Sequence, residues 1–205
     1  MTVQVEPAAI ARAQDAEADG PAESRLVARA RDGDCEAFDA LVALHMERVY
    51  RLAYRLCWHH EDAVDITQET FLRAFKRLRK LRADTDFAQW IYRIAVNRCL
   101  SYRARHARTA TLQPTPEPSG PVSDDPGLQA EARATSSRVR EEIRRLPRRQ
   151  QAAIVLFALE GRTVEETAAV MGCAAGTVKR HLHRARATLR GRLQDLCDDV
   201  SGERC

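Results

Sequence analysis

Aromatic residues are scarce in this chain, and sequence patterns typical of β-sheets are missing. Phe, Trp and Tyr together make up 5% of the 205 residues, and no alternating run of β-branched residues occurs. Charged residues make up 30% of the chain, and Leu, Ala and Arg are abundant. This composition argues against a β-sandwich or β-barrel and predicts an all-α protein.

Long apolar runs, a secretory leader and closely paired cysteines are also absent. No stretch approaches the roughly 18 apolar residues that a membrane span needs, and no basic segment followed by an apolar one opens the chain. The six cysteines are widely scattered, without a CxxC pair. We therefore expect reduced thiols, no membrane insertion and a cytoplasmic location.

The chain also lacks a recognisable catalytic constellation. None of its glycines lies in a phosphate-binding motif, and no nucleophile has a placed base and a third partner. We expect no enzymatic activity, no catalytic residue, no cofactor and no metal.

Proline is concentrated in one segment. Five of the eight prolines lie between Thr109 and Glu131, mixed with Gly, Ser and Asp, which predicts a flexible linker between two small helical domains. A connection of about 23 residues reaches roughly 75 Å when fully extended, so the domains could bind separate sites. The predicted organisation is an acidic, disordered tail (1–23), a first domain (24–108), the linker (109–137), a second domain (138–196) and a C-terminal tail (197–205).

Both predicted domains are more basic than the whole chain, whose formal net charge is +4. Residues 24–108 carry 17 basic and 11 acidic side chains, and residues 138–196 carry 13 and 6. Such an excess suits a polyanionic partner, although a solvated helix surface would also produce it. Motifs have to decide between the two.

Apolar periodicity predicts three helices in the first domain. Ala37 to Leu56 repeat at steps of three and four residues, with a break at Trp58. A second helix opens with acidic residues at Glu61, and Asp86 is suited to cap a third helix that carries Trp90.

The second domain contains a helix-turn-helix pattern. Thr163 to Glu166 has the form of a capping box, and Gly172 supplies a turn. A basic amphipathic helix follows from about Ala175, without a good cap residue before it. This helix is suited to a DNA major groove, although an ordinary αα-hairpin with a solvated basic face remains the alternative.

Two surface patterns stand out in the first domain. Asp65, Gln68 and Glu69 are spaced to share one helix face, and carboxylates repel phosphate, so this patch favours a protein partner. Basic residues precede a polar loop and the helix with Trp90, a combination suited to single-stranded DNA. Trp90 is also spaced to belong to the core.

Two pairs of segments resemble the extracytoplasmic-function (ECF) group of bacterial sigma-70 factors. Residues 62–75 (DAVDITQETFLRAF) and 90–97 (WIYRIAVN) are similar to the polymerase-binding helix and the next segment of region 2 in these proteins. Residues 146–150 (LPRRQ) and 176–186 (GTVKRHLHRAR) look like region 4. The resemblance covers 24–108 and 138–195, in the order the family has.

The resemblance implies a sigma factor that directs core RNA polymerase to promoters and aids melting, often in a stress response. Region 2 would bind the clamp coiled coil of the largest subunit, and region 4 would bind the flap of the second largest subunit. An anti-sigma factor would commonly control such a protein. The implied polymerase contacts are Asp65, Gln68, Glu69, Phe71 and Phe75, of which the two phenylalanines could be partly core.

The same resemblance implies two DNA sites. The −10 element would be bound around the loop 79–89, which would hold a flipped base; the implied contacts are Lys80, Arg82, Asp86, Arg93, Asn97 and Arg98. The −35 element would be read from the second helix of the helix-turn-helix; the implied contacts are Arg149, Thr177, Lys179, Arg180, His183, Arg184 and Arg186.

Two other interpretations remain open at this point. A two-domain regulator could bind DNA without the polymerase. A metal or thiol sensor could use Cys57, His59 and His60, or Cys197 and Cys205, although their spacing is nonstandard.

Overall fold

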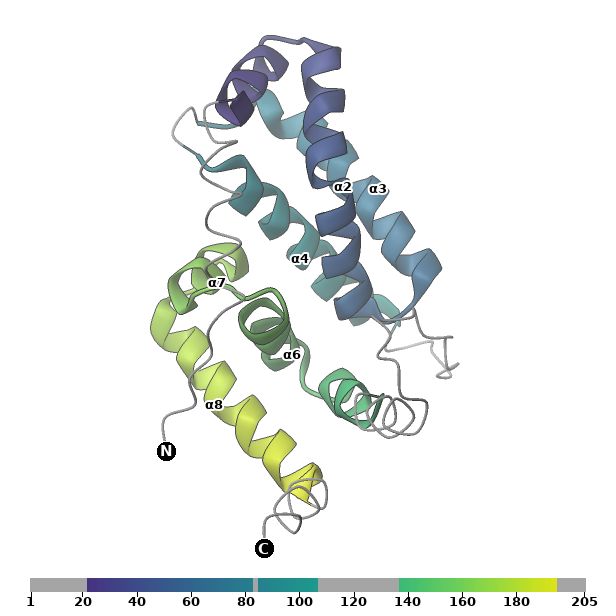
Figure 1. Ribbon diagram of the computed structural model, residues 1–205, viewed down its shortest axis with the longest axis vertical. Helices are drawn as coiled ribbons and strands as arrows, with labels where there is room; N and C mark the ends of the chain where they lie inside the picture. Colours follow the sequence, from purple (N-terminus) through teal and green to yellow (C-terminus); the bar gives the residue numbers. More distant parts are fainter. Residues whose placement is uncertain (1–21, 83–84, 107–136, 195–205) are drawn as a thin grey trace, which may run out of the picture.

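Figure 1 shows the computed structural model of the chain, which describes residues 22–82, 85–106 and 137–194. Over these ranges the chain forms helices and no strands, which confirms the all-α prediction. The predicted N-terminal tail lies almost wholly outside the described residues, as do the linker up to residue 136 and the whole C-terminal tail. No helix in the described part is long and apolar enough to cross a membrane.

The first domain begins with a helix over residues 22–31, followed by α2 (Cys35–Cys57). Asp34 caps α2, because its carboxylate accepts a hydrogen bond of 3.1 Å from the Ala37 amide. The predicted break is confirmed at Trp58, which has a left-handed backbone (φ 59°) and ends the helix.

The remaining helices of this domain are α3 (His60–Arg77), the short 3-10 turn η1 (Leu78–Lys80) and α4 (Phe87–His106). The three long helices α2, α3 and α4 pack side by side (Figure 1). Asp86 caps α4 as predicted, since its carboxylate accepts from the Gln89 amide at 3.0 Å. Fully buried side chains from all three helices form the core: Leu41, Leu52, Leu56, Ile66, Ile91 and Val96.

The second domain consists of a helix over 137–144 and four further elements. The helix that follows Pro147 does not stay α-helical up to Gly161. Instead, the α-helix stops at Ile154 and continues as one π-helical stretch, because the Glu160 amide bonds the Val155 carbonyl five residues back. The elements are α6 (Arg148–Ile154), the π-helix (Val155–Leu159), α7 (Val164–Met171) and α8 (Ala175–Arg192).

The two domains lie directly against each other. Helix α4 of the first domain packs on α7 and α6 of the second, and the end of α2 meets the π-helix (Figure 1). Buried apolar residues of both domains belong to one continuous cluster. This close packing was not predicted from the sequence.

Candidate protein and nucleic-acid interfaces

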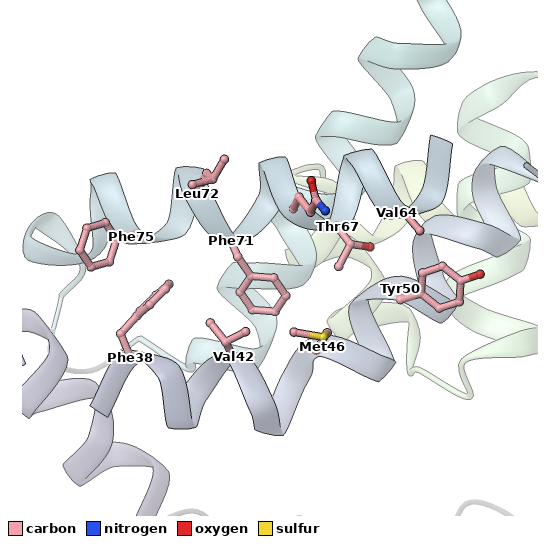
Figure 2. A pocket seen from close by; sticks show the side chains of 10 residues that line it. Phe38, Val42, Met46, Tyr50, Val64, Thr67, Phe71, Leu72 and Phe75 are labelled. Carbon is pink, nitrogen blue, oxygen red and sulfur yellow. The ribbon is translucent and has the colours of Figure 1, made fainter. Parts of the chain in front are cut away.

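An apolar groove of about 570 Å³ runs between α2 and α3. Figure 2 shows side chains from the two helices facing each other across it. Leu72 is 60% exposed and Phe75 is 50% exposed, which is unusual for large apolar side chains placed together. The full lining is Phe38, Val42, Met46, Tyr50, Val64, Thr67, Gln68, Phe71, Leu72 and Phe75.

The spacing of residues along α3 places its side of the groove. Val64, Gln68, Phe71 and Phe75 recur at steps of three and four residues and therefore share one helix face. Phe71 is 7% exposed and forms part of the floor. Phe75 lies at one end, with its ring edge-on to Phe38 at a centroid distance of 5.0 Å. The two phenylalanines among the predicted polymerase contacts thus differ: Phe71 is largely core, and Phe75 is accessible.

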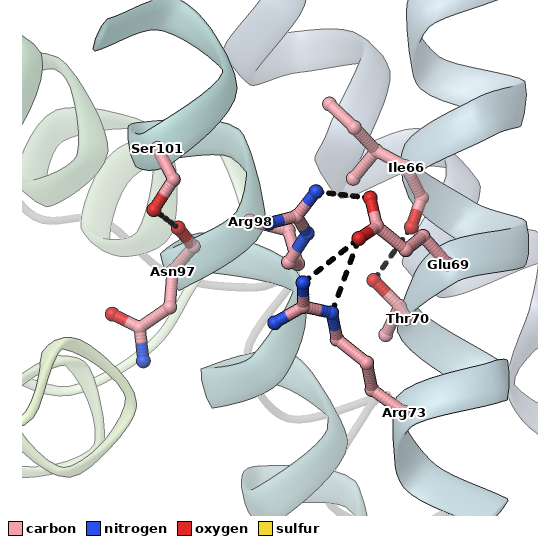
Figure 3. A network of polar contacts seen from close by, with 7 residues as sticks. All are labelled: Ile66, Glu69, Thr70, Arg73, Asn97, Arg98 and Ser101. Carbon is pink, nitrogen blue, oxygen red and sulfur yellow. Dashed lines mark hydrogen bonds and ion pairs between the residues drawn. The ribbon is translucent and has the colours of Figure 1, made fainter. Parts of the chain in front are cut away.

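The three predicted polar contacts on α3 also differ from one another. Asp65 and Gln68 are exposed. Glu69 instead faces α4, where Arg98 donates to its carboxylate (Figure 3). Arg73 binds the same carboxylate with N···O distances of 2.9 and 3.2 Å.

Glu69 and Arg98 therefore form an internal ion pair that links α3 to α4. Burial alone would raise the pKa of Glu69, but the hydrogen bonds from Arg98 and Arg73 outweigh it and lower that pKa. Arg98 is only 9% exposed. A predicted polymerase contact and a predicted −10 contact are thus joined to each other, which the sequence spacing of 29 residues did not indicate.

A second pocket, of about 410 Å³, opens between α3 and α4 on the side of this ion pair. Its walls combine guanidinium groups, an indole ring and amide and hydroxyl groups, a set that suits phosphates and stacked bases. Arg93 and Asn97 are exposed there. The lining residues are Arg73, Arg77, Trp90, Arg93, Ile94, Asn97, Arg98 and Ser101.

The loop before α4 continues this basic surface. Lys80 and Arg82 are exposed, and residues 83–84 lie outside the described part. Trp90 is half-buried, with its ring 5.8 Å from that of the buried Phe87. Trp90 packs on the core, as its spacing predicted, and it also lines the pocket.

The helix-turn-helix is formed by α7 and α8. Thr163 and Glu166 make both hydrogen bonds of the predicted capping box, at 3.1 and 2.7 Å. Gly172 has the left-handed backbone (φ +64°) that the turn requires. As expected, α8 has no side-chain cap, because the residue before its first turn is Ala174.

Helix α8 presents a basic face to solvent. Val178, Leu182 and Ala185 are buried and hold the helix against α6 and α7. Among the predicted −35 contacts on α8, Thr177 is half-buried. The other five are exposed: Lys179, Arg180, His183, Arg184 and Arg186. Arg149, at the start of α6, is exposed as well.

Sequence reasoning missed His181, which lies at the edge of this face. Burial and the nearby charges of Arg149, Arg180 and Arg184 lower the pKa of His181 below its ordinary value of 6.5. The charge of Arg149 therefore acts on α8 from another helix. Position 181 follows the buried Val178 by three residues, and that spacing is the signal that would have found it.

Arg186 lies beside a third pocket, of about 410 Å³, between α8 and the π-helix. Its guanidinium carbon is 5.3 Å from the centre of the Phe157 ring, within the range of a cation–π contact. Lys179 and His183 line the same pocket. The basic face of α8 thus has an apolar edge on this side.

The possible metal or thiol site lacks support in the described ranges. No group of three His, Cys, Asp or Glu side chains could hold a metal there. His59 accepts from the Asp62 amide at 3.5 Å, and His60 bonds the Tyr50 hydroxyl at 2.8 Å. Cys57 is a free thiol. Cys197 and Cys205 lie outside the described residues.

Comparison with known families matches both domains. The family "Sigma-70 region 2" matches residues 41–109. The family "Sigma-70, region 4" matches residues 136–189. The two matches have the order that the sequence segments suggested.

Relatives in other bacteria cover both regions. The RNA polymerase sigma-H factor of Pseudomonas aeruginosa is 32% identical over 85% of this chain and 95% of its own length. The ECF RNA polymerase sigma-E factor of Escherichia coli is 32% identical over 83% and 94%. The ECF sigma factor SigE of Mycolicibacterium smegmatis is 38% identical over 75% of this chain, which spans 60% of that relative.

A solved structure, CnrH in complex with the cytosolic domain of CnrY, has a TM-score of 0.63 and 28% identity. It covers 85% of this chain and 98% of CnrH. The apolar groove, the basic helix α8 and these matches agree with one family. The chain belongs to the ECF group of sigma-70 factors, the proteins of promoter-specific transcription initiation.

Proposed function

We propose that this chain binds core RNA polymerase through the groove between α2 and α3 and carries it to promoters with two elements. Residues 24–108 serve as region 2 and residues 138–196 as region 4. The observation that carries the proposal is the presence, on one small chain, of an open apolar groove and two separate basic faces on α4 and α8.

The polymerase contact would combine apolar burial with acidic steering. Phe75 and Leu72 offer exposed apolar surface to a helix laid in the groove, and we assign this helix to the clamp coiled coil of the largest subunit. Asp65 and Gln68 at the same helix face would pair with basic or polar groups of that partner. Glu69 would act indirectly, because its carboxylate is held by Arg98 and Arg73.

The −10 strand would enter the pocket between α3 and α4. Arg93 and Asn97 would contact bases or phosphates, and Trp90 offers an edge for stacking. Lys80 and Arg82 would bind the backbone near the loop, while Arg98 would mainly orient this wall. The carboxylate of Asp86 is bound by the Gln89 amide, so its role would be to shape the loop.

The −35 duplex would meet α8 in the major groove. Lys179, Arg180 and Arg184 have the exposure that direct base or phosphate contacts need, and each good base contact supplies about 1 to 3 kcal/mol of discrimination. Burial and the neighbouring arginine charges lower the pKa of His181, which favours the neutral ring that can both donate and accept a hydrogen bond. Elsewhere on this domain, the flap of the second largest subunit would bind.

The chain would act in the cytoplasm and would have no enzymatic activity of its own. CnrH was solved with the cytosolic domain of CnrY, and we propose that an anti-sigma protein controls this chain in a comparable way. Such a protein would compete with the polymerase for the exposed groove.

Binding to sigma-free core RNA polymerase tests the proposal. We expect the variant Asp65→Ala with Phe75→Ala to bind at least tenfold more weakly than the wild type, because an exposed aromatic anchor in an interface is often worth more than about 1.4 kcal/mol. Asp39→Ala with Leu44→Ala is the matched control: both residues are exposed on α2, outside the groove, and should leave binding unchanged. Equal affinity of the two double variants would contradict the proposal.

A further inference from the structure

A histidine is buried inside the first domain, close to the start of α4. His45 on α2 is 3% exposed. Its Nε2 lies 3.2 Å from a carboxylate oxygen of Glu23, which belongs to the helix over residues 22–31. Because an ionised carboxylate can only accept, Nε2 carries a hydrogen and donates it. Glu23, which was predicted to lie in the tail, is therefore bonded to the core of the domain.

The second ring nitrogen of His45 shows what holds this side chain. Nδ1 is buried and has no hydrogen-bond partner among the described residues. An unpaired buried nitrogen costs free energy, and a phenylalanine ring would fill the same place without that cost. The bond to Glu23 is thus the polar contact that fixes the orientation of the imidazole ring.

A row of rings leads from His45 to the pocket between α3 and α4. The centre of the His45 ring is 5.3 Å from that of Phe87, the first residue of α4. The Phe87 ring is in turn 5.8 Å from the ring of Trp90, which lines the pocket. Because Phe87 is buried and interiors are close-packed, a displacement of His45 is passed on to Trp90.

The helix over 22–31 also reaches the other side of the loop that precedes α4. The turn after this helix contains Gly33 with a positive φ of 103°, and a Cβ added there would be 3.6 Å from Nη2 of Arg79 in η1. Arg29 closes the turn through an ion pair with Asp34 at 2.6 Å. Figure 1 shows the helix (dark purple) beside the segment between α3 and α4. One helix and its turn thus lie against both sides of the loop.

We propose that His45 is a positioning residue for the −10 surface: held by Glu23, it fixes the start of α4 and, through Phe87, the ring of Trp90. The support of α4 stands on the contacts alone, while its effect on promoter DNA rests on the proposed function. His45 itself is buried and does not touch DNA. Loss of its bond lets the His45 and Phe87 rings reorient, so that Trp90 meets a base in the right orientation less often.

Hydrogen exchange of the free chain tests the support of α4. The Gln89 and Trp90 amides bond the carboxylate and the carbonyl of Asp86 at 3.0 Å each, so their exchange reports opening of the first turn of α4. We expect these amides to exchange at least about fivefold faster in Glu23→Ala, because the acceptor for His45 is gone.

Glu23→Gln is the matched control. It loses the same charge as Glu23→Ala but keeps a side-chain oxygen that accepts from Nε2 of His45, so its exchange should be that of the wild type. Equal rates in the wild type and Glu23→Ala, or equal acceleration by both variants, would overturn the proposal.

His45→Phe separates the bond from the packing. This variant keeps a ring against Phe87 but cannot bond Glu23, so we expect it to speed exchange at Gln89 and Trp90 as Glu23→Ala does. Circular dichroism should show the helix content of the wild type. Wild-type exchange in a folded His45→Phe would contradict the role of the bond.

Transcription from randomised DNA by core RNA polymerase connects this support to the promoter. With Glu23→Ala, enrichment of the downstream block should fall about threefold relative to Glu23→Gln, because fewer chains hold Trp90 in the competent orientation. Enrichment of the upstream block should be equal, whereas a purely structural loss would lower transcription without changing the balance of the blocks.

The two measurements separate the positioning role from the proposed function. Equal enrichment of the downstream block together with faster exchange in Glu23→Ala would overturn the effect on promoter DNA. No downstream block with the wild-type chain would contradict the proposed −10 function, and hydrogen exchange would still decide the role of His45.

Discussion

The basic side chains of α4 and of α8 have different surroundings, although both helices were predicted to bind DNA. On α4, Arg98 is buried and joined to Glu69, and Arg93 lies against the second domain. On α8, Lys179, Arg180 and Arg184 are exposed and have no ion-pair partner among the described residues. A basic residue on a DNA-binding helix can therefore belong to the architecture or to the recognition surface, and only its partners distinguish the two.

We expect the largest effect from a substitution of the buried Arg98 on α4, which should lower stability. Arg98→Ala removes the partner of Glu69 and empties a buried site, so we expect a loss of about 1 to 3 kcal/mol in the free energy of unfolding, reduced by the partial exposure of Glu69. Arg93→Ala should change stability by less than about 0.5 kcal/mol. Urea unfolding of both variants measures this, and equal losses would erase the distinction.

For the exposed basic residues of α8, we expect a substitution to weaken DNA binding without changing stability. Arg180→Ala should weaken binding of the polymerase holoenzyme to promoter duplex about tenfold, because a base or phosphate contact is worth about 1 to 3 kcal/mol. The unfolding midpoint should stay unchanged. Arg190→Ala, an exposed change nearly three turns further along α8, serves as a control, and a loss of similar size there would show that only general charge matters.

The position of α8 should also depend on the capping box of α7. Thr163→Ala removes the hydroxyl that accepts from the Glu166 amide, and we expect a loss of about 1 kcal/mol in the free energy of unfolding. Thr188→Ala is the control. Its exposed hydroxyl donates to a carbonyl within its own helix and does not cap a helix end. Equal thermal midpoints for the two variants would contradict the role of the cap.

The smallest predicted effect is a pH dependence of the α3–α4 ion pair. The pKa of Glu69 is lowered in the folded chain from its ordinary value of 4.5, so the unfolded chain binds more protons as the pH falls through this range. The pair should therefore stabilise the fold above about pH 4.5 and lose this contribution as the pH falls below it. Glu69→Gln should show a flatter stability profile between pH 5 and pH 3, and parallel profiles would contradict the assignment.

Local features could be predicted from the sequence because they depend on neighbours in the chain. Apolar spacing predicted α2, and the residue types at Asp86 and Thr163 predicted two caps. The basic face of α8 followed from the same periodicity. Nearby residues alone determine these features, and the structure confirms them.

Features that join distant segments could not be predicted in this way. The pairing of Glu69 with Arg98, the π-helical stretch after Ile154 and the contact of Arg55 with Glu160 all depend on how helices meet in space. Only part of the apolar groove was found from the sequence. Phe71 and Phe75 on α3 were named, whereas none of the residues that α2 contributes was. One chain without aligned relatives carries no signal for such contacts.

Transcription from a randomised DNA library by core RNA polymerase and this chain tests the central claim most directly. We predict that the transcribed templates share two enriched blocks at a constant spacing upstream of the start site, and that Arg180→Ala weakens selection of the upstream block only. No transcription beyond that of core enzyme alone, or enrichment of a single block, would contradict a sigma factor that reads two promoter elements.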